Sequence, residues 1–423
     1  MDRKSEVKMI IDSKKYNGPC ECGRQHEMFT KFCIVERGCL ADIDRYIAEN
    51  GLCGYSVAVY DENTYNAEGL IRPLADKEII LPAKDLHADD HGVALLMERL
   101  PESVDYLIAV GSGTIHDIVR YSAYEKGIDF VSCPTAASVD GFCSSVAAMT
   151  WHGFKKTLTA VAPRIVVADL NVITKAPLRL ARSGFGDMVG KYIALSDWRI
   201  ASLLTGEYFC QKIYDITESA TKKILDSAGG IVSGDTEAYE ALTVGLLMSG
   251  LAMQLLGNSR CASGAEHHIS HIIEMRPEPL GLSSDALHGE KVGVGSLIAI
   301  GEYHRIAELS GIEFCDYPAI PVDYIESIFG DRLSESIINE NEKDAAASVT
   351  KEMLEQNFEG IREIINDIPK VDELVSIYKS IGALTTLSDI GVSEDKREEL
   401  VNYSPLVRNR ITLMRLRRAM KNI

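Results

Sequence analysis

The chain has little positive charge. Its 423 residues carry 44 Lys and Arg against 62 Asp and Glu, which gives a formal net charge of −18 at pH 7. Nucleic-acid-binding proteins present a basic face, so this balance argues against DNA or RNA as a partner. It also argues against binding to an anionic membrane surface. An anionic small substrate would need Lys or Arg placed locally in its site.

The sequence has no segment that we expect to direct it into or across a membrane. The N-terminal stretch MDRKSEVKMIIDSKKY is charged and has no apolar core of signal-peptide type. The stretch 241–259 has no charge, but it contains Thr243, Ser249 and Gln254 and has no aromatic belt at its ends. We interpret it as a buried central helix and expect no membrane span.

The ten cysteines have no regular spacing, and we expect them to be reduced in a cytoplasmic protein. One local cluster stands apart, in which Cys20, Cys22 and His26 follow the pattern C-x-C-x3-H, with Cys33 nearby. Two interpretations stay open for it, a structural zinc knuckle and a set of plain surface cysteines.

Internal repeats and low-complexity segments are also absent from the sequence. The order in which strand-like and helix-like apolar patterns follow one another predicts the fold. Up to about residue 175, β-rich runs at 54–60, 106–110, 130–133 and 165–168 alternate with helical patterns such as 88–100 and 115–126. This alternation predicts an α/β domain over residues 1–175 with a Rossmann-like, mainly parallel sheet. Helical periodicity then dominates and predicts an all-α domain over residues 176–423. Its expected helices are 187–204, 210–228, 237–256, 288–309 and 345–364, with a basic helix over 408–421.

A glycine-rich turn follows the β-rich run at 106–110. Gly111-Ser-Gly-Thr-Ile-His-Asp117 lies between an expected strand and an expected helix. Glycines let the backbone approach a pyrophosphate, and the N-terminus of the helix offers unpaired N–H groups. The spacing G-x-G lacks the last glycine of the dinucleotide fingerprint, so a purely structural turn is the alternative.

A second polar loop, 134–145, follows the next strand and is expected in the same crevice. It offers Thr135, Ser138 and Ser144 to phosphate or ribose oxygens and Asp140 to a substrate hydroxyl; a serine-rich turn without a ligand is the alternative. Asp61 ends another strand, where a carboxylate can bind an adenosine ribose.

Histidines gather in the second half of the chain. His267, His268 and His271 lie within five positions, and His288 follows after two prolines. With Asp187 they offer a carboxylate and imidazoles to a divalent cation, which would polarise a carbonyl during hydride transfer. The pattern differs from H-E-x-x-H, so a zinc protease is not expected. Spacing does not decide which histidines bind.

At these residues the chain resembles the sn-glycerol-1-phosphate dehydrogenases of bacterial type, within the iron-type alcohol dehydrogenase and dehydroquinate synthase superfamily. The matching stretches are 111–117, 134–141, 184–187, 263–267 and 288–290. The resemblance implies a dehydroquinate synthase-like fold, a homodimer, NAD or NADP, one Zn²⁺ or Ni²⁺, and a place in phospholipid biosynthesis. Ser112 and Val139 depart from residues common in the family.

The resemblance also implies roles for residues. The metal ligands would be Asp187, His267 and His288, while His271 and Asp140 would contact substrate, with Asp187 and His271 as catalytic residues and His268 in packing. Nucleotide contacts would come from a larger set: Asp61, Gly111, Gly113, Thr114, Ile115, Asp117, Thr135, Ala136, Ala137, Ser138 and Ser144.

The implied reaction is reversible reduction of dihydroxyacetone phosphate, a small phosphorylated C3 substrate, to sn-glycerol 1-phosphate. Candidate cations for its phosphate are Lys155, Lys156 and Lys191. The alternatives are a glycerol dehydrogenase, which needs no such cations, and a dehydroquinate synthase-like cyclase that uses NAD catalytically.

Overall fold

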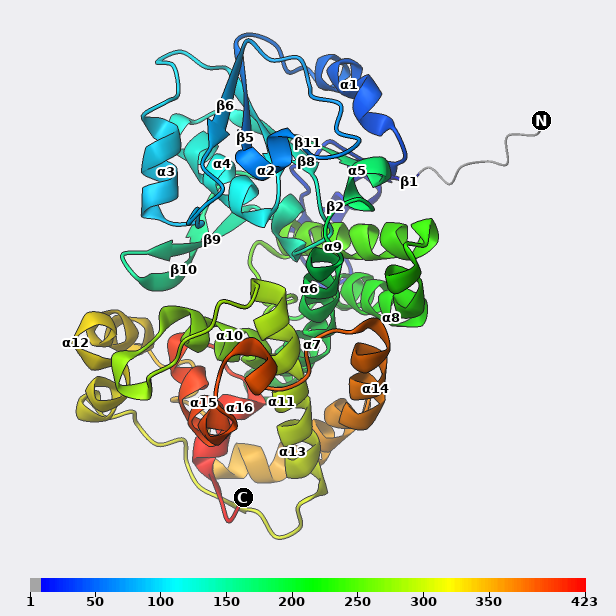
Figure 1. The fold of residues 1–423 in the computed structure, drawn as a ribbon. Helices are drawn as coiled ribbons and strands as arrows, with labels where there is room; N and C mark the ends of the chain where they lie inside the picture. The colour runs from blue at the N-terminus through cyan, green and yellow to red at the C-terminus, as the bar shows by residue number, and fades with distance from the viewer. Residues whose placement is uncertain (1–8) are drawn as a thin grey trace. The chain divides into compact units, whose positions relative to one another are not determined.

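The computed structural model describes residues 9–423 (Figure 1). The first eight residues, which begin the charged N-terminal stretch, lie outside the described residues. The chain forms two compact units. Unit 1 comprises the residues up to Met188 together with Lys222–Asn258, and unit 2 comprises Val189–Thr221 and Ser259–Ile423. The division is interleaved, and a boundary between two domains at residue 175 stays a prediction.

Unit 1 contains a seven-stranded sheet in the order β1-β4-β11-β8-β7-β5-β6. All neighbouring pairs are parallel except β1 with β4 at one edge. The strands are β1 (Met9–Asp12), β4 (Phe32–Glu36), β5 (Ser56–Asp61), β6 (Lys77–Leu81), β7 (Tyr106–Gly111), β8 (Asp129–Pro134) and β11 (Ile165–Asp169). Two hairpins lie outside this sheet, β2 (Gly18–Pro19) with β3 (Gln25–His26) and β9 (Val146–Trp151) with β10 (Phe154–Thr159).

Alternate residues of the central strands enter two different cores, as expected for a sheet buried on both faces. Ala58 and Ile108 pack with α1 and its preceding turn, whereas Val57 and Leu107 pack with α3 and α4. The helices of this unit are α1 (Ile43–Glu49), α2 (Glu62–Tyr65), α3 (Asp90–Met97), α4 (Gly113–Lys126), α5 (Leu170–Ile173) and α9 (Thr236–Leu256). Helices α6 (Leu178–Val189) and α8 (Gln211–Ser233) cross from one unit into the other.

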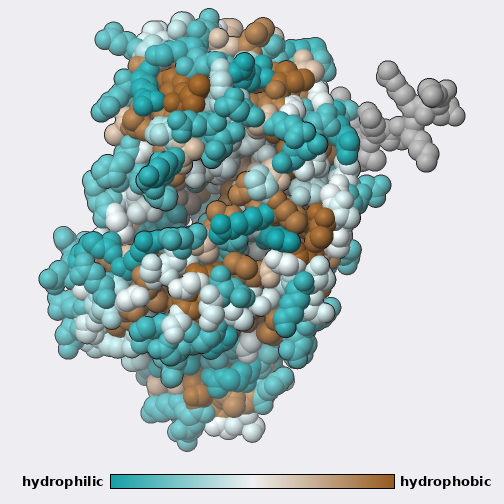
Figure 2. All heavy atoms as spheres, in the orientation of Figure 1, coloured by the Kyte–Doolittle hydropathy of each residue, from teal (hydrophilic) through white to brown (hydrophobic). Residues whose placement is uncertain are grey.

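Helix α9 is the uncharged segment that we interpreted as a core helix. Among the described residues it alone is long and apolar enough to cross a membrane, and 89% of its most apolar window is buried. The interpretation as a buried helix is therefore confirmed. Hydrophilic residues predominate on the face shown in Figure 2, and hydrophobic residues form separate patches among them.

Near its C-terminus, α9 carries Gln254, whose amide joins three segments of unit 1. Its Oε1 accepts hydrogen bonds from the backbone N–H groups of Phe29, at 2.9 Å, and Thr30, at 3.2 Å. Its Nε2 donates to Thr30 Oγ1 at 2.8 Å and to the carbonyl of Cys143. Both ends of the buried amide are thus satisfied.

Unit 2 is helical apart from the short pair β12 (Glu313–Phe314) and β13 (Met420–Lys421). Its helices are α7 (Lys191–Thr205), α10 (Ala265–Met275), α11 (His288–Glu308), α12 (Val322–Asn341), α13 (Lys351–Asn366), α14 (Val371–Ile381), α15 (Arg397–Tyr403) and α16 (Leu413–Leu416). The sheet domain followed by helices confirms the predicted fold class. The expected basic helix over 408–421 was wrong, since the segment forms only the short α16, a 3-10 turn and β13.

Asp197 of α7 connects three parts of unit 2. Its carboxylate accepts from Tyr303 Oη at 2.6 Å and from the backbone N–H groups of Leu413 and Ala265, both at 2.9 Å. Burial is the main cause that raises the pKa of this carboxyl to about 7. The bond to Ala265 satisfies an N–H at the beginning of α10, the helix that carries the histidine cluster.

Candidate active site

The glycine-rich turn connects β7 to α4 as expected for a nucleotide-binding βα unit. Gly111 ends β7, Ser112 is the N-cap of α4, and Gly113 begins the helix. A Cβ on Gly113 would lie 2.7 Å from Cγ2 of Val139, so only glycine fits there without a shift. Thr135 N donates to Gly111 O at 3.1 Å, which ties the two predicted loops together. The turn therefore presents the N-terminus of a 14-residue helix at the end of a buried strand.

Three predicted nucleotide-binding elements share one edge of the sheet. Strands β5, β7 and β8 are neighbours and parallel, so Asp61, Gly111 and Pro134 lie at adjacent carboxyl ends. The strand order reverses between β5 and β7, which is where ligands bind in open α/β sheets. Asp61 is the N-cap of α2, and its Oδ1 accepts from Asn63 N and Thr64 N, both at 2.8 Å.

A buried arginine that we did not single out in the sequence holds the second loop. Arg120 of α4 is fully buried and pairs with Asp117 Oδ1 at 2.6 Å. It also donates to the carbonyls of Phe142, at 3.1 Å, and Gly141. One oxygen of Asp117, a predicted nucleotide contact, therefore pairs with Arg120. The i,i+3 spacing of Asp117 and Arg120 on the expected helix is the sequence signal for this ion pair.

The rest of the polar loop is largely buried. Thr135, Ala136, Ala137, Ser138 and Ser144 are all less than a tenth exposed. Ser144 Oγ accepts from Val146 N at 3.0 Å, so this hydroxyl serves the local turn.

Helix α6 lies against this loop and brings Asp187 to Asp140. A side chain on Gly184 would collide with the carbonyl of Ala137, which explains why the helix has glycine there. Asp187 is fully buried, and its Oδ2 accepts from the backbone N–H of Asp140 at 3.0 Å. The Asp140 carboxylate accepts from Ser249 Oγ of α9 at 2.8 Å. The predicted carboxylate ligand and the predicted substrate-binding aspartate thus stand side by side in unit 1.

In unit 2, α10 and α11 bring the clustered histidines together. A Cβ on Gly295 of α11 would lie 2.7 Å from the carbonyl of Glu266, so glycine permits close approach of the two helices. The ring centroids of His267 and His288 are 5.4 Å apart, and each residue offers a ring nitrogen within 4.8 Å of the other. His271 lies 5.9 Å from His267 and 6.2 Å from His288, between ring centroids.

Each of the two predicted histidine ligands donates to a carboxylate. Nδ1 of His267 lies 2.6 Å from Glu266 Oε1, and Nδ1 of His288 lies 2.8 Å from Glu274 Oε1. A carboxylate only accepts, so each Nδ1 carries a hydrogen, and in the neutral tautomer that a metal requires each Nε2 keeps a lone pair. Carboxylate–histidine pairs of this kind orient metal-binding imidazoles. The two imidazoles therefore suit a divalent cation, and neither glutamate was predicted from the sequence.

Two further histidines on α10 remain neutral. Burial, with positive charge from Arg408 and other groups, holds the pKa values of His268 and His271 well below the usual range. Both ring nitrogens of His268, and Nδ1 of His271, have no hydrogen-bond partner among the described residues. Both imidazoles are less than a tenth exposed, so they titrate outside the neutral range.

The candidate cations differ in their surroundings. Lys191 is fully buried, and its Nζ donates to the Ala262 carbonyl at 3.0 Å. Lys156 is exposed over the ring of Phe154, and Lys155 is partly buried. Arg408 was expected in a basic C-terminal helix and not in the site, yet its charge acts on both neutral histidines of α10.

Known proteins resemble this chain over most of its length. Residues 34–177 match the iron-containing alcohol dehydrogenase family. Glycerol-1-phosphate dehydrogenase (NAD(P)+) of Halalkalibacterium halodurans is 30% identical over 417 residues, which cover 96% of this chain and 97% of the relative. The enzyme of that name from Bacillus subtilis is 31% identical over 364 residues, covering 84% of this chain and 80% of the relative.

Solved structures share the fold. A probable glycerol dehydrogenase from Sinorhizobium meliloti has a TM-score of 0.59 at 19% identity, with 90% of each chain covered. Maleylacetate reductase from a Rhizobium strain has a TM-score of 0.56 at 14% identity, with 98% of each chain covered. These likenesses concern the fold, whereas the sequence relatives define the family. The chain belongs to the glycerol-1-phosphate dehydrogenase family, within the iron-containing alcohol dehydrogenase superfamily.

Proposed function

We propose that this protein reduces dihydroxyacetone phosphate to sn-glycerol 1-phosphate with NADH or NADPH, and catalyses the reverse reaction. The observation that carries the proposal is the near full-length likeness to glycerol-1-phosphate dehydrogenases, in a chain that keeps two carboxylate-oriented histidines. The nucleotide would bind at the carboxyl ends of β5, β7 and β8, with its pyrophosphate at the N-terminus of α4. We propose that its contacts are Asp61 and ten residues of the two loops: Gly111, Gly113, Thr114, Ile115, Asp117, Thr135, Ala136, Ala137, Ser138 and Ser144.

For the metal we propose Asp187, His267 and His288 as ligands, with zinc or nickel as the ion. One carboxylate and two neutral imidazoles leave such an ion positively charged with open positions, and it would polarise a substrate carbonyl. Asp187 is buried and oriented by the N–H of Asp140, and the imidazoles are oriented by Glu266 and Glu274.

Substrate would contact Asp140 and His271. Ser249 orients the Asp140 carboxylate, which can accept a hydrogen bond from a substrate hydroxyl. His271 is neutral, so one nitrogen of its imidazole can donate a hydrogen bond to the substrate oxygen and the other can accept one. Lys191 and Arg408 are our candidates for binding the substrate phosphate.

We also propose that the protein is a cytoplasmic homodimer. The family resemblance supports the homodimer, and the expected reduced cysteines support the cytoplasmic location.

The test is an assay of metal-loaded protein with NADH and dihydroxyacetone phosphate, followed by stereochemical analysis of the product. We expect stoichiometric oxidation of NADH, formation of sn-glycerol 1-phosphate, and much slower turnover of dihydroxyacetone. Equal rates with both ketones would identify a glycerol dehydrogenase instead. Turnover without net oxidation of NADH would indicate a cyclase of the dehydroquinate synthase type.

A further inference from the structure

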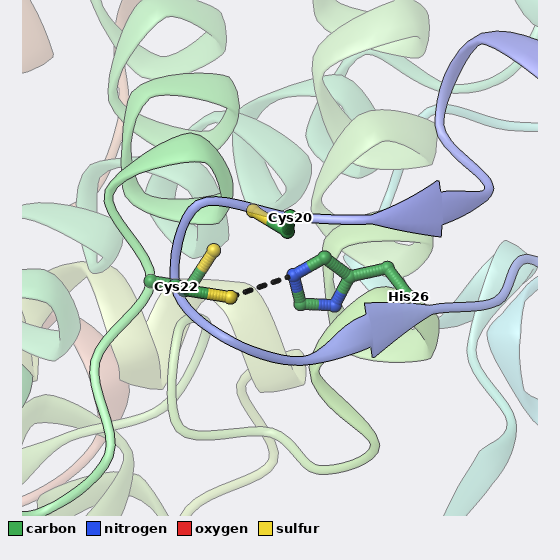
Figure 3. A group of neighbouring side chains, drawn as sticks. Cys20, Cys22 and His26 are labelled. Carbon is green, nitrogen blue, oxygen red and sulfur yellow. Dashed lines mark hydrogen bonds between the residues drawn. The ribbon is translucent and has the colours of Figure 1, made fainter.

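The hairpin of β2 and β3 gathers two thiols and an imidazole on one side (Figure 3). Cys20 follows β2, Cys22 lies in the turn and His26 ends β3. Cys22 Sγ lies 3.3 Å from His26 Nε2, and the three ligand atoms lie within 4.8 Å of one another. The turn is fixed by hydrogen bonds from Gly23 N to Cys20 O and from Cys20 N to Arg24 O, both 2.9 Å.

The orientation of His26 leaves one nitrogen suited to bind a metal. Its Nδ1 lies 2.7 Å from the carbonyl oxygen of Leu255 in the last turn of α9. A carbonyl only accepts, so Nδ1 carries a hydrogen, and in the neutral ring Nε2 presents its lone pair toward Cys22. An N–H that donates to a carbonyl is the usual arrangement behind a metal-binding histidine. It also satisfies a carbonyl that the end of the helix leaves without an intrahelical partner.

The hairpin has little else to stabilise it. Each strand is two residues long, and a two-stranded hairpin is marginal in water even when longer. Between Gly18 and Glu27, His26 is the one buried residue, at 3% exposure. The imidazole of His26 is therefore buried where a stable hairpin would bury apolar side chains. Cys33 is not part of this group, because it lies in β4 and its thiol forms a hydrogen bond with the thiol of Cys143.

We propose that Cys20, Cys22 and His26 bind a structural Zn²⁺ ion, separate from the metal of the active site. Two thiolates and a neutral imidazole balance the charge of a divalent cation and are ligands that zinc prefers. A structural zinc ion takes four ligands, so one further ligand completes the site. Metal binding would supply the folding free energy that the short strands lack.

Cobalt substitution tests this site without any measurement of enzyme activity. Thiolate bound to Co²⁺ gives an ultraviolet charge-transfer band, which the sulfur-free set of Asp187, His267 and His288 cannot produce. We expect the full-length protein loaded with Co²⁺ to show the band. The variants C20S and C22S should weaken or lose it, and the exposed-cysteine control C53S should retain it.

Metal analysis and a conservative variant complete the experiment. The double variant C20S/C22S should retain one equivalent of zinc less than C53S. His26→Asn keeps an N–H donor for the Leu255 carbonyl but removes Nε2, so it should lose the metal while retaining native far-ultraviolet circular dichroism. Absence of the band in the native protein, its full persistence in C20S/C22S, or a Cys20–Cys22 disulfide in the purified protein would overturn the proposal.

Discussion

The carboxylate of Glu266 accepts a hydrogen bond from Nδ1 of His267, its neighbour in the chain, at 2.6 Å. The same oxygen accepts from the backbone N–H of Gly264 at 2.9 Å, so the carboxylate is fixed at the beginning of α10. The fully buried Glu266 therefore sets both the tautomer and the direction of the His267 ring.

The substitution Glu266→Gln should weaken binding of the active-site metal about 10–100-fold, because loss of such a partner makes the imidazole a poorer ligand. Titration of metal-free protein with Zn²⁺ measures the change. Glu308→Gln, at an exposed carboxylate of α11, is the control and should bind as the native protein does. Equal affinities for the two variants would show that Glu266 does not orient a ligand.

His267 and His268 are neighbours with opposite expected roles. His267→Leu should lose the active-site metal, whereas His268→Leu should keep it, because both ring nitrogens of His268 lack partners among the described residues. Replacing an unsatisfied buried polar ring by an apolar side chain is close to neutral for folding. Metal content after extensive dialysis decides between them, and retention in both variants would contradict the ligand assignment.

Gly113 should be intolerant of a side chain because of Val139. Gly113→Ala places a methyl group 2.7 Å from Val139 Cγ2, and overpacking of this kind costs about 1–3 kcal/mol. We expect the KM for NADH to rise about ten- to a hundredfold. The double variant G113A/V139A should recover most of the loss, and V139A alone serves as the control. A G113A variant with unchanged KM would place the nucleotide elsewhere.

Arg408 should matter for the phosphate of the substrate. Arg408→Met removes the charge but keeps an apolar chain, and a hydrogen bond to a charged group contributes about 1.5–3 kcal/mol. The KM for dihydroxyacetone phosphate should therefore rise at least about tenfold, while the KM for dihydroxyacetone stays unchanged. A parallel rise for both ketones would indicate a structural role.

His116 should make stability fall as the pH falls. Burial lowers the pKa of this imidazole from 6.5 to about 3, so below pH 6.5 the unfolded chain binds a proton that the folded chain excludes. Each pH unit between 6.5 and about 3 then costs up to about 1.4 kcal/mol. His116→Asn keeps a donor for the Ser112 carbonyl and cannot titrate. Urea unfolding across this range should show the native protein losing stability relative to H116N; a constant difference would refute the burial argument.

The sequence predicted four of the buried strands but not β4, whose Cys33, Ile34 and Val35 are buried as well. The runs at β5, β7, β8 and β11 consist of apolar residues, because helices cover both sides of the sheet. The edge strand β6 escaped notice because its sequence KEIIL mixes exposed and buried positions. A single helix was expected over 187–204, but the structure ends α6 at Val189 and begins α7 at Lys191. Helical periodicity continues across this break, so the sequence pattern did not predict that the helix ends there.

The sequence also predicted the ligand types of the site better than their surroundings. Histidine spacing placed His267 and His271 on one face of α10, and the structure agrees. The partner glutamates could not be assigned, since Glu274 reaches His288 only through the packing of α10 on α11. Arg408 lies over a hundred positions from α10 in the chain, so spacing could not connect the two.

The amide of Gln254 shows that the shape of a side chain alone does not decide which residue a buried position accepts. Glutamate has nearly the same shape, but it would set an oxygen against the carbonyl of Cys143 where the amide nitrogen now donates. Position 254 therefore distinguishes glutamine from glutamate by whether one side-chain atom donates or accepts a hydrogen bond. A single amide-to-acid change there would loosen the connection between residues 29–30, which follow the hairpin of β2 and β3, and the loop of Asp140, without altering any residue in either.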